Sequence, residues 1–379
     1  MKPWLWWCVD GLLALAIVLF LLPLDPRISS LPLLLWLAIQ LLLAPQPRRW
    51  ALWPLLALML LSTRTWWFND PPHPASFFDG VLFVVALLAS TTVPLQRWTA
   101  VLRLPLLAGV PLLVLVGDKP WTPNPAAGSN QGAYLLGLLL LQAVVWLWQR
   151  QQRWWQRLTA LAAVLINFGL VWQTGSRAAL ISAGVALMVV WLRERARRGR
   201  WWPDLVRLLF LSSGVYLLRW LVFSTNSSLP GFKSGSDLGR LLTAECFGGL
   251  PFTGNNRLLY GVGFERLKEF CQVPFQGLTL QHAHNLYLQI WAATGLLGML
   301  ALGLVLVLLI RSWLTVELDM PLMLRCSGQA ALIYCFLQGC FDVSVMHWPI
   351  TLAFSALLIG MPLAFVPALT SSAQGADRR

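Results

Sequence analysis

Charged residues are scarce in this chain of 379 residues: only 11% are Asp, Glu, Lys or Arg, whereas 58% are hydrophobic. A soluble domain carries about a quarter charged residues. The chain therefore lacks the polar side chains that would cover a water-exposed surface, which excludes an ordinary soluble enzyme. It also lacks a C-x-x-C motif or a His/Cys cluster, so the sequence suggests no metal site. No internal repeat is evident either.

The hydrophobic residues occur in long blocks, such as 11–24, 131–148 and 296–310, rather than at amphipathic spacing. A helix needs roughly 20 such residues to cross the hydrocarbon core, where only helices and closed barrels satisfy their own backbone. We therefore predict an all-α polytopic membrane protein with a single integral membrane domain over residues 1–379 and about twelve spans. The predicted spans are 4–24, 28–45, 49–62, 77–95, 101–117, 131–148, 157–173, 177–193, 204–223, 284–311, 322–343 and 347–368.

Most of the 28 basic residues fall on connections that are cytoplasmic if the N-terminus is cytoplasmic. The short connections on the opposite side hold only Arg27, Arg64, Lys119 and Arg177. Basic residues are retained on the cytoplasmic side of membrane proteins. We therefore expect a multi-pass protein of the bacterial inner (plasma) membrane with both termini in the cytoplasm. The net charge of +13 is then mostly a topology signal, which favours contacts with membrane lipids over a nucleic-acid partner.

A loop at residues 224–283, between the ninth and tenth predicted spans, would lie on the periplasmic side. Loops longer than about 15 residues inside a compact architecture are usually functional, and polar side chains concentrate in this one. Its stretch Asp237 to Phe247 is predicted as a short helix. Cys246 and Cys271 also lie in it, where the compartment is oxidising. They can form a disulfide across the loop or stay free, and the sequence leaves both open.

The loop ends directly before the tenth span, so that His284 would lie at the N-terminal end of this helix and Asn285 in its first turn. The positive end of the helix dipole disfavours a protonated imidazole there, so that His284 can accept a proton near pH 7. The alternative is that His284 only anchors the helix end at the interface. His282 lies two residues away, with no second feature to fix its role. Asp342, near the outer end of the eleventh span, is a candidate to orient His284 or an arginine.

Arg177 follows a very short outer turn, Thr174-Gly-Ser, at the start of the eighth span. An ionisable residue at the membrane boundary is a candidate functional residue. Its guanidinium can bind phosphate oxygens in pairs, and the N-terminus of the following helix would reinforce an anion site. The alternative is an arginine that reaches to the outer interface and has no chemical role.

Three motifs in order resemble the O-antigen ligase/polymerase family. His284-Asn285, nine residues and Gly295-Leu-Leu-Gly298 resemble its H-[NSQ]-x9-G-x-x-G signature, at the start of a span after a large loop. Thr174-Gly-Ser-Arg177 is similar to its SR-containing hairpin. Arg240, followed by Gly261-Val-Gly263-Phe, resembles its R…G-x-G-x-F stretch. The chain departs from the family by lacking a Trp shortly after Arg240 and the usual Pro before Gly261. The resemblance extends over roughly residues 165 to 360.

The resemblance implies a GT-C-like membrane glycosyltransferase of O-antigen, lipopolysaccharide or polysaccharide biosynthesis. It would move a glycan from a polyprenyl-diphosphate carrier to an acceptor hydroxyl at the periplasmic face, without a metal or other cofactor. The acceptor would be a lipid-linked or lipid A-core-like glycan. Catalysis would need cations for the diphosphate and a base for the hydroxyl. The candidate catalytic residues are His284, Arg177 and Arg240. The candidate substrate-binding residues are Arg257, Asn285, Gly261, Gly263 and His282.

Three further interpretations stay open. A polymerase of the same family, which uses a second lipid-linked glycan as its acceptor, shares these motifs, as does a relative that glycosylates Ser or Thr side chains of proteins. A transporter of a small anion belongs to another class. It would need helices broken at mid-membrane, often related by internal symmetry. The polar residues here gather at the outer face instead.

Overall fold

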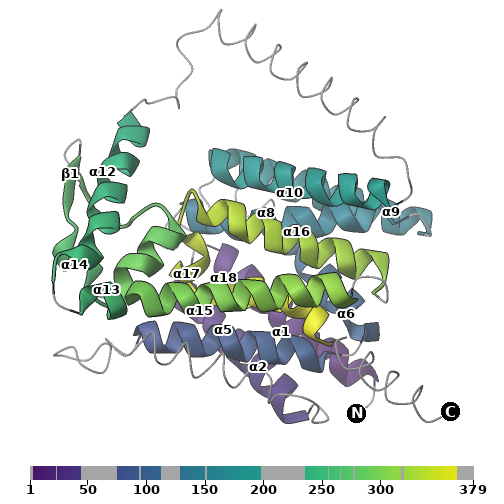
Figure 1. The fold of residues 1–379 in the computed structure, drawn as a ribbon. Coiled ribbons are helices and arrows are strands. Elements are labelled where there is room, and N and C mark those ends of the chain that lie inside the picture. The colour runs from purple at the N-terminus through teal and green to yellow at the C-terminus, as the bar shows by residue number, and fades with distance from the viewer. Residues whose placement is uncertain are drawn as a thin grey trace, which may run out of the picture.

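The computed structural model describes residues 3–22, 24–43, 75–93, 95–111, 129–149, 152–197, 235–254, 256–264, 266–275, 278–316 and 320–364. Over these ranges the chain is mostly helical, and long helices lie side by side in a bundle (Figure 1). The helices of the bundle are α1 (Pro3–Leu21), α2 (Ser30–Leu43), α5 (Ala75–Thr92), α6 (Leu95–Arg103), α8 (Ser129–Leu147), α9 (Trp154–Gln173), α10 (Arg177–Ala196), α15 (Leu286–Val316), α16 (Leu322–Gly339) and α18 (Pro349–Gly360). Four 3-10 helices accompany them: η1 (Pro26–Ser29), η3 (Leu104–Leu107), η4 (Leu250–Phe252) and η5 (Met361–Ala364).

Helix α18 forms the centre of the bundle. All of its residues from Ile350 to Gly360 are buried, and it packs against α5, α16 and α8. A helix that is hydrophobic on every side is stable only where it is surrounded, and the sequence of α18 has that character. Helix α8 is buried over most of its length as well. The remaining helices pair around this centre, α8 with α9 and α10 with α16.

Helix α9 carries an exposed hydrophobic stripe on its outer side. Leu158, Leu161, Leu165, Phe168 and Trp172 are all exposed, and their spacing of three or four residues places them on one helix face. Soluble proteins rarely expose contiguous apolar surface on this scale. Three helices of the described chain, at 130–147, 154–173 and 286–313, are long and apolar enough to cross a membrane. The protein is membrane-embedded.

Most of the predicted spans that fall in the described residues are occupied by helices. The stretch 101–117 is different. Helix α6 ends at Arg103, and Leu104–Leu107 forms the 3-10 helix η3. Pro105 has no backbone N–H to donate, so the regular helix does not continue through it. The predicted spans 49–62 and 204–223 lie outside the described residues.

A smaller layer, which we call the cap, covers one end of the bundle (Figure 1). It consists of α12 (Gly235–Gly249), η4, α13 (Arg257–Tyr260), α14 (Leu267–Phe270) and the antiparallel strands β1 (Val273–Phe275) and β2 (Leu278–Leu280). Helix α12 confirms the helix predicted over Asp237–Phe247. The cap has a hydrophobic core of its own, in which Phe247, Val262 and Leu267 pack on Ala292 and Ala293 of α15.

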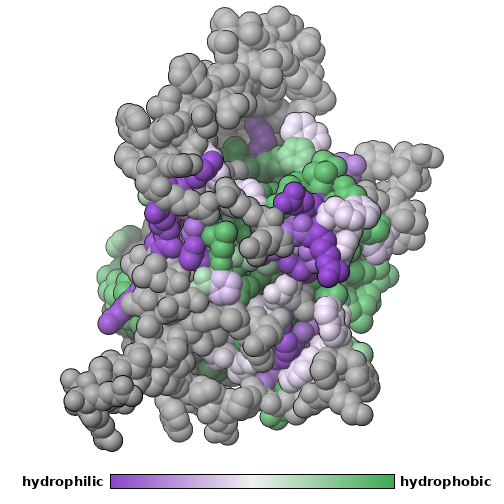
Figure 2. All heavy atoms as spheres, turned by 90° about the vertical axis from the view of Figure 1, so that its right-hand side faces the viewer, coloured by the Kyte–Doolittle hydropathy of each residue, from purple (hydrophilic) through white to green (hydrophobic). Residues whose placement is uncertain are grey.

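The opposite end of the bundle is rich in charge. Helix α10 ends there with Arg193 and Arg195 in its last turn, and Arg325 of α16 forms a two-pronged ion pair with Glu194. Figure 2 looks onto this end and shows hydrophilic residues among hydrophobic ones. The two ends of the bundle are therefore chemically different: one carries the cap and the other carries basic residues.

Candidate functional site

His284 and Asn285 lie at the junction between the cap and α15. Asn285 is the N-cap of α15, because its Oδ1 accepts hydrogen bonds from the backbone N–H groups of Tyr287 (3.0 Å) and Leu288 (3.1 Å). Asparagine and serine side chains are preferred at this position because they satisfy amides that a helix leaves unpaired. The residue was expected in the first helical turn, and it instead precedes the helix. Asn285 is therefore a structural element of the motif.

The same amide side chain joins α15 to the end of α16. Asn285 Nδ2 donates to the backbone carbonyl of Cys340 at 3.1 Å. Cys340 is the C-cap of α16, two residues before Asp342. One side chain thus caps the helix that follows His284 and fixes the chain that carries Asp342.

Asp342 faces His284, with its Oδ1 4.0 Å from His284 Nδ1. The carboxylate is buried, with 8% of its side chain exposed. It accepts hydrogen bonds from the Val343 N–H (2.8 Å) and the Ser344 hydroxyl (2.5 Å), which hold its orientation. The histidine backbone has a φ of +49°, a left-handed conformation in which histidine is enriched among non-glycine residues. This left-handed turn in the backbone directly precedes the N-cap residue of α15.

Arg240 on α12 completes the site. A cavity of about 330 Å³ opens between α12, the start of α15 and the end of α16, and its lining includes Arg240, His284, Asn285, Cys340 and Phe341. The arginine side chain is exposed at this cavity. The structure therefore brings together two of the three predicted catalytic residues, 44 positions apart in the sequence (284 − 240), and adds a buried carboxylate.

Two side-chain contacts hold α12 over the start of α15. The Thr243 hydroxyl, fully buried, lies 3.5 Å from the Ala283 carbonyl oxygen. The Trp291 indole N–H donates to the Gly248 carbonyl at 3.1 Å. A third bond, from the Ala283 N–H to Gln289 Oε1 (3.0 Å), fixes the chain just before His284. No local sequence pattern connects Thr243 with Ala283, or Gly248 with Trp291, because each pair is separated by 40 residues or more.

The electrostatic environment keeps His284 neutral near pH 7. Burial of the imidazole lowers its pKa below the ordinary value. The charge of Asp342 opposes this shift and raises the pKa, whereas Arg240 and His282 lower it further. Desolvation therefore lowers the pKa of His284 in the same direction as the expected effect of the helix end. A neutral imidazole in this position can accept a proton, and the nearby carboxylate would stabilise the imidazolium that forms.

Two further histidines, His282 and His347, form a pair near Asp342. The rings of His282 and His347 are 5.7 Å apart, edge to face, and His347 also contacts Trp348 at 5.5 Å. Burial lowers the pKa of both histidines, and Asp342 raises it in both. His282 therefore belongs to the surroundings of the site. His282 is not among the residues that line the cavity at His284. A role of His282 in substrate binding stays a prediction.

The Gly261-Val-Gly263 stretch of the cap packs directly against α15 near Gly295. The Val262 and Gly263 N–H groups donate to the carbonyls of Ala292 (3.0 Å) and Ala293 (2.8 Å). At this point α15 departs from helical geometry, with φ +60° at Gly295. A Cβ on Gly295 would lie 2.7 Å from the Gly261 nitrogen and from the Leu258 oxygen. The glycines are needed for this close approach.

This contact changes the role of Gly261 and Gly263. Both are buried against α15, and both have positive φ angles, +67° and +88°. The geometry gives them a packing function that places the cap on the bundle, while contact with substrate stays a prediction. The predicted span 284–311 is one continuous helix, and the structure instead breaks α15 at Gly295. There Gly295 packs closely against α13 and the turn that follows it.

The other two predicted arginines lie outside the cavity lining. Arg257 donates to Thr253 Oγ1 at 2.9 Å and stacks over the Phe270 ring at 4.5 Å, so its guanidinium is engaged within the cap. Arg177 is exposed at the first residue of α10, after the N-cap Ser176. The turn between α9 and α10 lies at the same end of the bundle as the cap (Figure 1).

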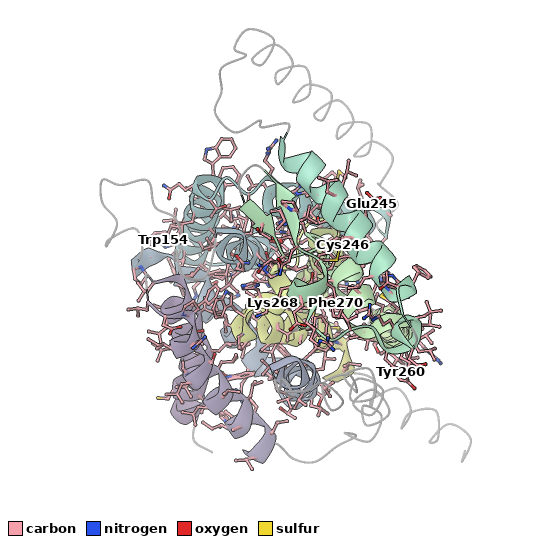
Figure 3. The ribbon with its side chains drawn as sticks, turned by 90° about the vertical axis from the view of Figure 1, so that its left-hand side faces the viewer. Trp154, Glu245, Cys246, Tyr260, Lys268 and Phe270 are labelled. Carbon is pink, nitrogen blue, oxygen red and sulfur yellow. A yellow bond between two sulfur atoms is a disulfide. The ribbon has the colours of Figure 1, made fainter. Side chains whose placement is uncertain are left out.

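Cys246 and Cys271 are joined by a disulfide. It connects α12, which carries Arg240, to the residue that follows α14. Figure 3 looks onto the cap and shows Cys246 on α12 near Phe270 at the end of α14. Cys271 is fully buried in the core of the cap. The covalent link therefore fixes the helix that supplies the arginine.

The fold and site define a membrane-embedded helical protein with a His–Asp pair beneath a cap that carries an arginine. Residues 161–303 match the O-antigen ligase family, which confirms the resemblance over the turn before Arg177, the cap and the His284 motif. The match ends before Asp342, whereas the resemblance was expected to reach about residue 360. No curated protein matches the chain significantly.

Proposed function

We propose that the protein transfers a glycan from a polyprenyl-diphosphate carrier to an acceptor hydroxyl, as an O-antigen ligase-like glycosyltransferase. The observation that carries this proposal is the shared cavity of His284 and Arg240 with Asp342 behind the histidine. A base and a cation at one open cavity suit a reaction that removes a proton from a hydroxyl and releases an anion. The family match supports the same class of reaction.

In the proposed reaction, the acceptor hydroxyl attacks the anomeric carbon of the donor sugar. The new carbon–oxygen bond forms as the bond from that carbon to the diphosphate oxygen breaks, and the leaving diphosphate keeps the electron pair. His284 takes the hydroxyl proton, and Asp342 stabilises the resulting imidazolium. The positive charge of Arg240 stabilises the negative charge on the departing oxygen. Arg177, from the turn at the same end of the bundle, supplies a second cation to the diphosphate or the glycan.

We further propose that the cap faces the periplasm and the basic end faces the cytoplasm of a bacterial inner membrane. The arginines at the far ends of α10 and α16 support this orientation, because basic residues are retained in the cytoplasm. Both termini would then be cytoplasmic, and about twelve spans would cross the membrane. In this orientation the disulfide lies in an oxidising compartment.

Transfer by the purified protein tests the proposal. A fluorescent polyprenyl-diphosphate glycan is offered in vesicles with a panel of acceptors: a lipid A-core glycan, a second lipid-linked glycan, and a Ser/Thr peptide. Wild type is compared with His284→Ala, Arg240→Ala and Arg177→Ala, and with Arg257→Ala as the matched arginine control. Transfer by wild type and by the control, with loss in the other variants at unchanged folding, supports the enzyme. The productive acceptor separates ligase from polymerase.

The absence of transfer to every acceptor by folded wild type, with donor bound equally by all variants, would contradict the proposal. Solute flux in the same vesicles would then test a transporter of a small anion.

A further inference from the structure

One edge of the cap, formed by η4 and α13, exposes apolar side chains. We call Phe252, Leu258 and Leu259 the η4–α13 edge. Phe252 is 71% exposed, and the two leucines are each 42% exposed. The exposed residues of α14 are instead charged, Lys268 and Glu269. The cap therefore has one side that suits water and another that suits an apolar partner.

The η4–α13 edge is continuous with an exposed apolar face of α15. Helix α13 packs on α15 at the break, where a Cβ on Gly295 would lie 2.7 Å from the Leu258 carbonyl oxygen. Beyond the break, the exposed large hydrophobic residues of α15 are Leu296, Leu300, Leu304, Val307 and Ile310. Their spacing of three or four residues places them on one face of the helix. In a membrane-embedded protein such a face suits the hydrocarbon of the bilayer.

The exposed face of α15 is shorter than the membrane is thick. From Leu296 to Ile310, which are 14 positions apart (310 − 296), a helix rises about 21 Å, whereas a hydrocarbon core is roughly 30 Å thick. The next residue, Arg311, is exposed and marks the far boundary, because an arginine near the end of a span extends to the interface. A tilted helix would cover still less of the membrane. The hydrocarbon therefore extends about 9 Å past Leu296, to the level at which α13 and η4 pack on α15.

We propose that the η4–α13 edge inserts between the acyl chains of the leaflet on the cap side, close to the lipid headgroups. Seen from the cap side, Tyr260 at the end of α13 lies nearer the rim of the molecule than Phe270 of α14 (Figure 3), so α13 is placed beside the surrounding lipid. The charged residues of α14 stay in water. Lipid, rather than a second copy of the chain, is the partner because the edge prolongs an apolar face that is too short to cross the hydrocarbon by itself.

Photoreactive phospholipids test the insertion on the full wild-type chain. Two probes carry an aryl diazirine on the acyl chain, one next to the glycerol and one at the terminal methyl group. The protein is reconstituted in phospholipid vesicles that contain either probe, and labelled residues are mapped by mass spectrometry. We expect the shallow probe to label Phe252, Leu258 and Leu259. The deep probe should label Leu300 and Leu304, which lie about 10 to 17 Å along the helix from Arg311 and so near the middle of the bilayer.

A double variant tests whether the two leucines hold α13 in the lipid. Leu258→Gln/Leu259→Gln makes these side chains polar, while the atoms that meet Gly295 belong to the backbone. We expect loss of shallow labelling at Phe252 and faster amide exchange in α13 in vesicles, with exchange in α16 unchanged. Lys268→Gln is the matched control, because Lys268 is exposed on α14 of the same cap. The control should change neither the labelling nor the exchange.

An unlabelled η4–α13 edge, in vesicles in which Leu300 and Leu304 are labelled, would overturn the proposal. Labelling of α14 as strong as that of the edge would overturn it too, as would unchanged labelling of Phe252 in the double variant. Labelling of the edge that appears only when the protein is diluted in lipid would show that a second copy covers it, and would likewise contradict insertion. The labelling map uses wild-type protein, so it decides the question even if the double variant does not fold. None of these measurements uses transfer activity, so their outcome is independent of the proposed function.

Discussion

Asp342 and His284 face each other across 4.0 Å at the junction of three helices. They lie 58 positions apart in the sequence (342 − 284), and the amide of Asn285 joins their two chain segments. The Asp342 carboxylate contacts the imidazole and is not among the residues that line the cavity. It acts through the imidazole, as a positioning residue.

The pH profile of Asp342→Asn tests this role. Asp342 raises the pKa of His284, so its neutralisation should move the acidic limb of kcat/KM to lower pH. The rate at pH 7 should nevertheless fall, by about 10- to 1000-fold, because the imidazolium loses its counter-charge. Asp342→Glu should restore part of the rate. An unshifted acidic limb, with a loss that stability alone explains, would show that Asp342 is only structural.

Arg240 has the opposite electrostatic effect on the base. It lowers the pKa of His284, so Arg240→Ala should raise that pKa and move the acidic limb of kcat/KM to higher pH. Activity should fall about 100- to 1000-fold, since the leaving group loses a cation. Arg240→Lys keeps the charge without the planar fork. It should keep the limb in place and recover part of the rate, and identical pH profiles in all three proteins would refute the assignment.

Asn285 is expected to act through stability. Asn285→Ala removes the N-cap of α15 and should cost about 1 kcal/mol, within the usual range of 0.5–2 kcal/mol. Asn285→Ser retains a capping oxygen and loses the bond to Cys340, so its thermal midpoint should lie between wild type and the alanine variant. Thermal unfolding in detergent provides the measurement. Equal midpoints for Ala and wild type would show that the cap contributes nothing.

The sequence predicted helices and motif residues better than it predicted contacts between distant parts of the chain. Helical spans follow from uninterrupted hydrophobic blocks, and α12 follows from a local pattern. His284 and Arg240 were found because each belongs to a motif. Asp342 was a candidate to orient His284 or an arginine, and the structure places it beside His284. The Thr243 contact and the docking of Gly261 on Gly295 depend on chain segments that only the folded bundle brings together. The interruption of the helix at Leu104–Leu107 was not predicted, because hydrophobicity alone does not register the backbone donor that Pro105 lacks.

The disulfide should stabilise the cap. The Cys246→Ser/Cys271→Ser variant loses a link across 25 residues, and loop-closure entropy assigns such a link about 3 kcal/mol. Hydrogen exchange should rise first in α12 and α14, which the bond connects. Transfer should fall through an increased donor KM, as Arg240 loses its fixed position. Exchange and KM equal to those of wild type would mean that the hydrogen bonds of Thr243 and Trp291 alone hold the cap in place.

Because Gly295 packs closely against Gly261, we expect alanine to destabilise the protein at Gly295 but not at Gly303 of the same helix. Gly295→Ala forces a Cβ to within 2.7 Å of the backbone of the cap, at a φ of +60° that non-glycine residues rarely adopt. We expect a loss of about 1–3 kcal/mol from backbone strain, with α13 displaced from α15. Gly303→Ala, on the same helix with no heavy atom near the added Cβ, should be neutral or stabilising by about 0.5–1 kcal/mol. Thermal midpoints of the two variants in detergent decide the matter: if both rise together, the cap does not need glycine at 295, and the contact between the motifs is not what seats it on the bundle.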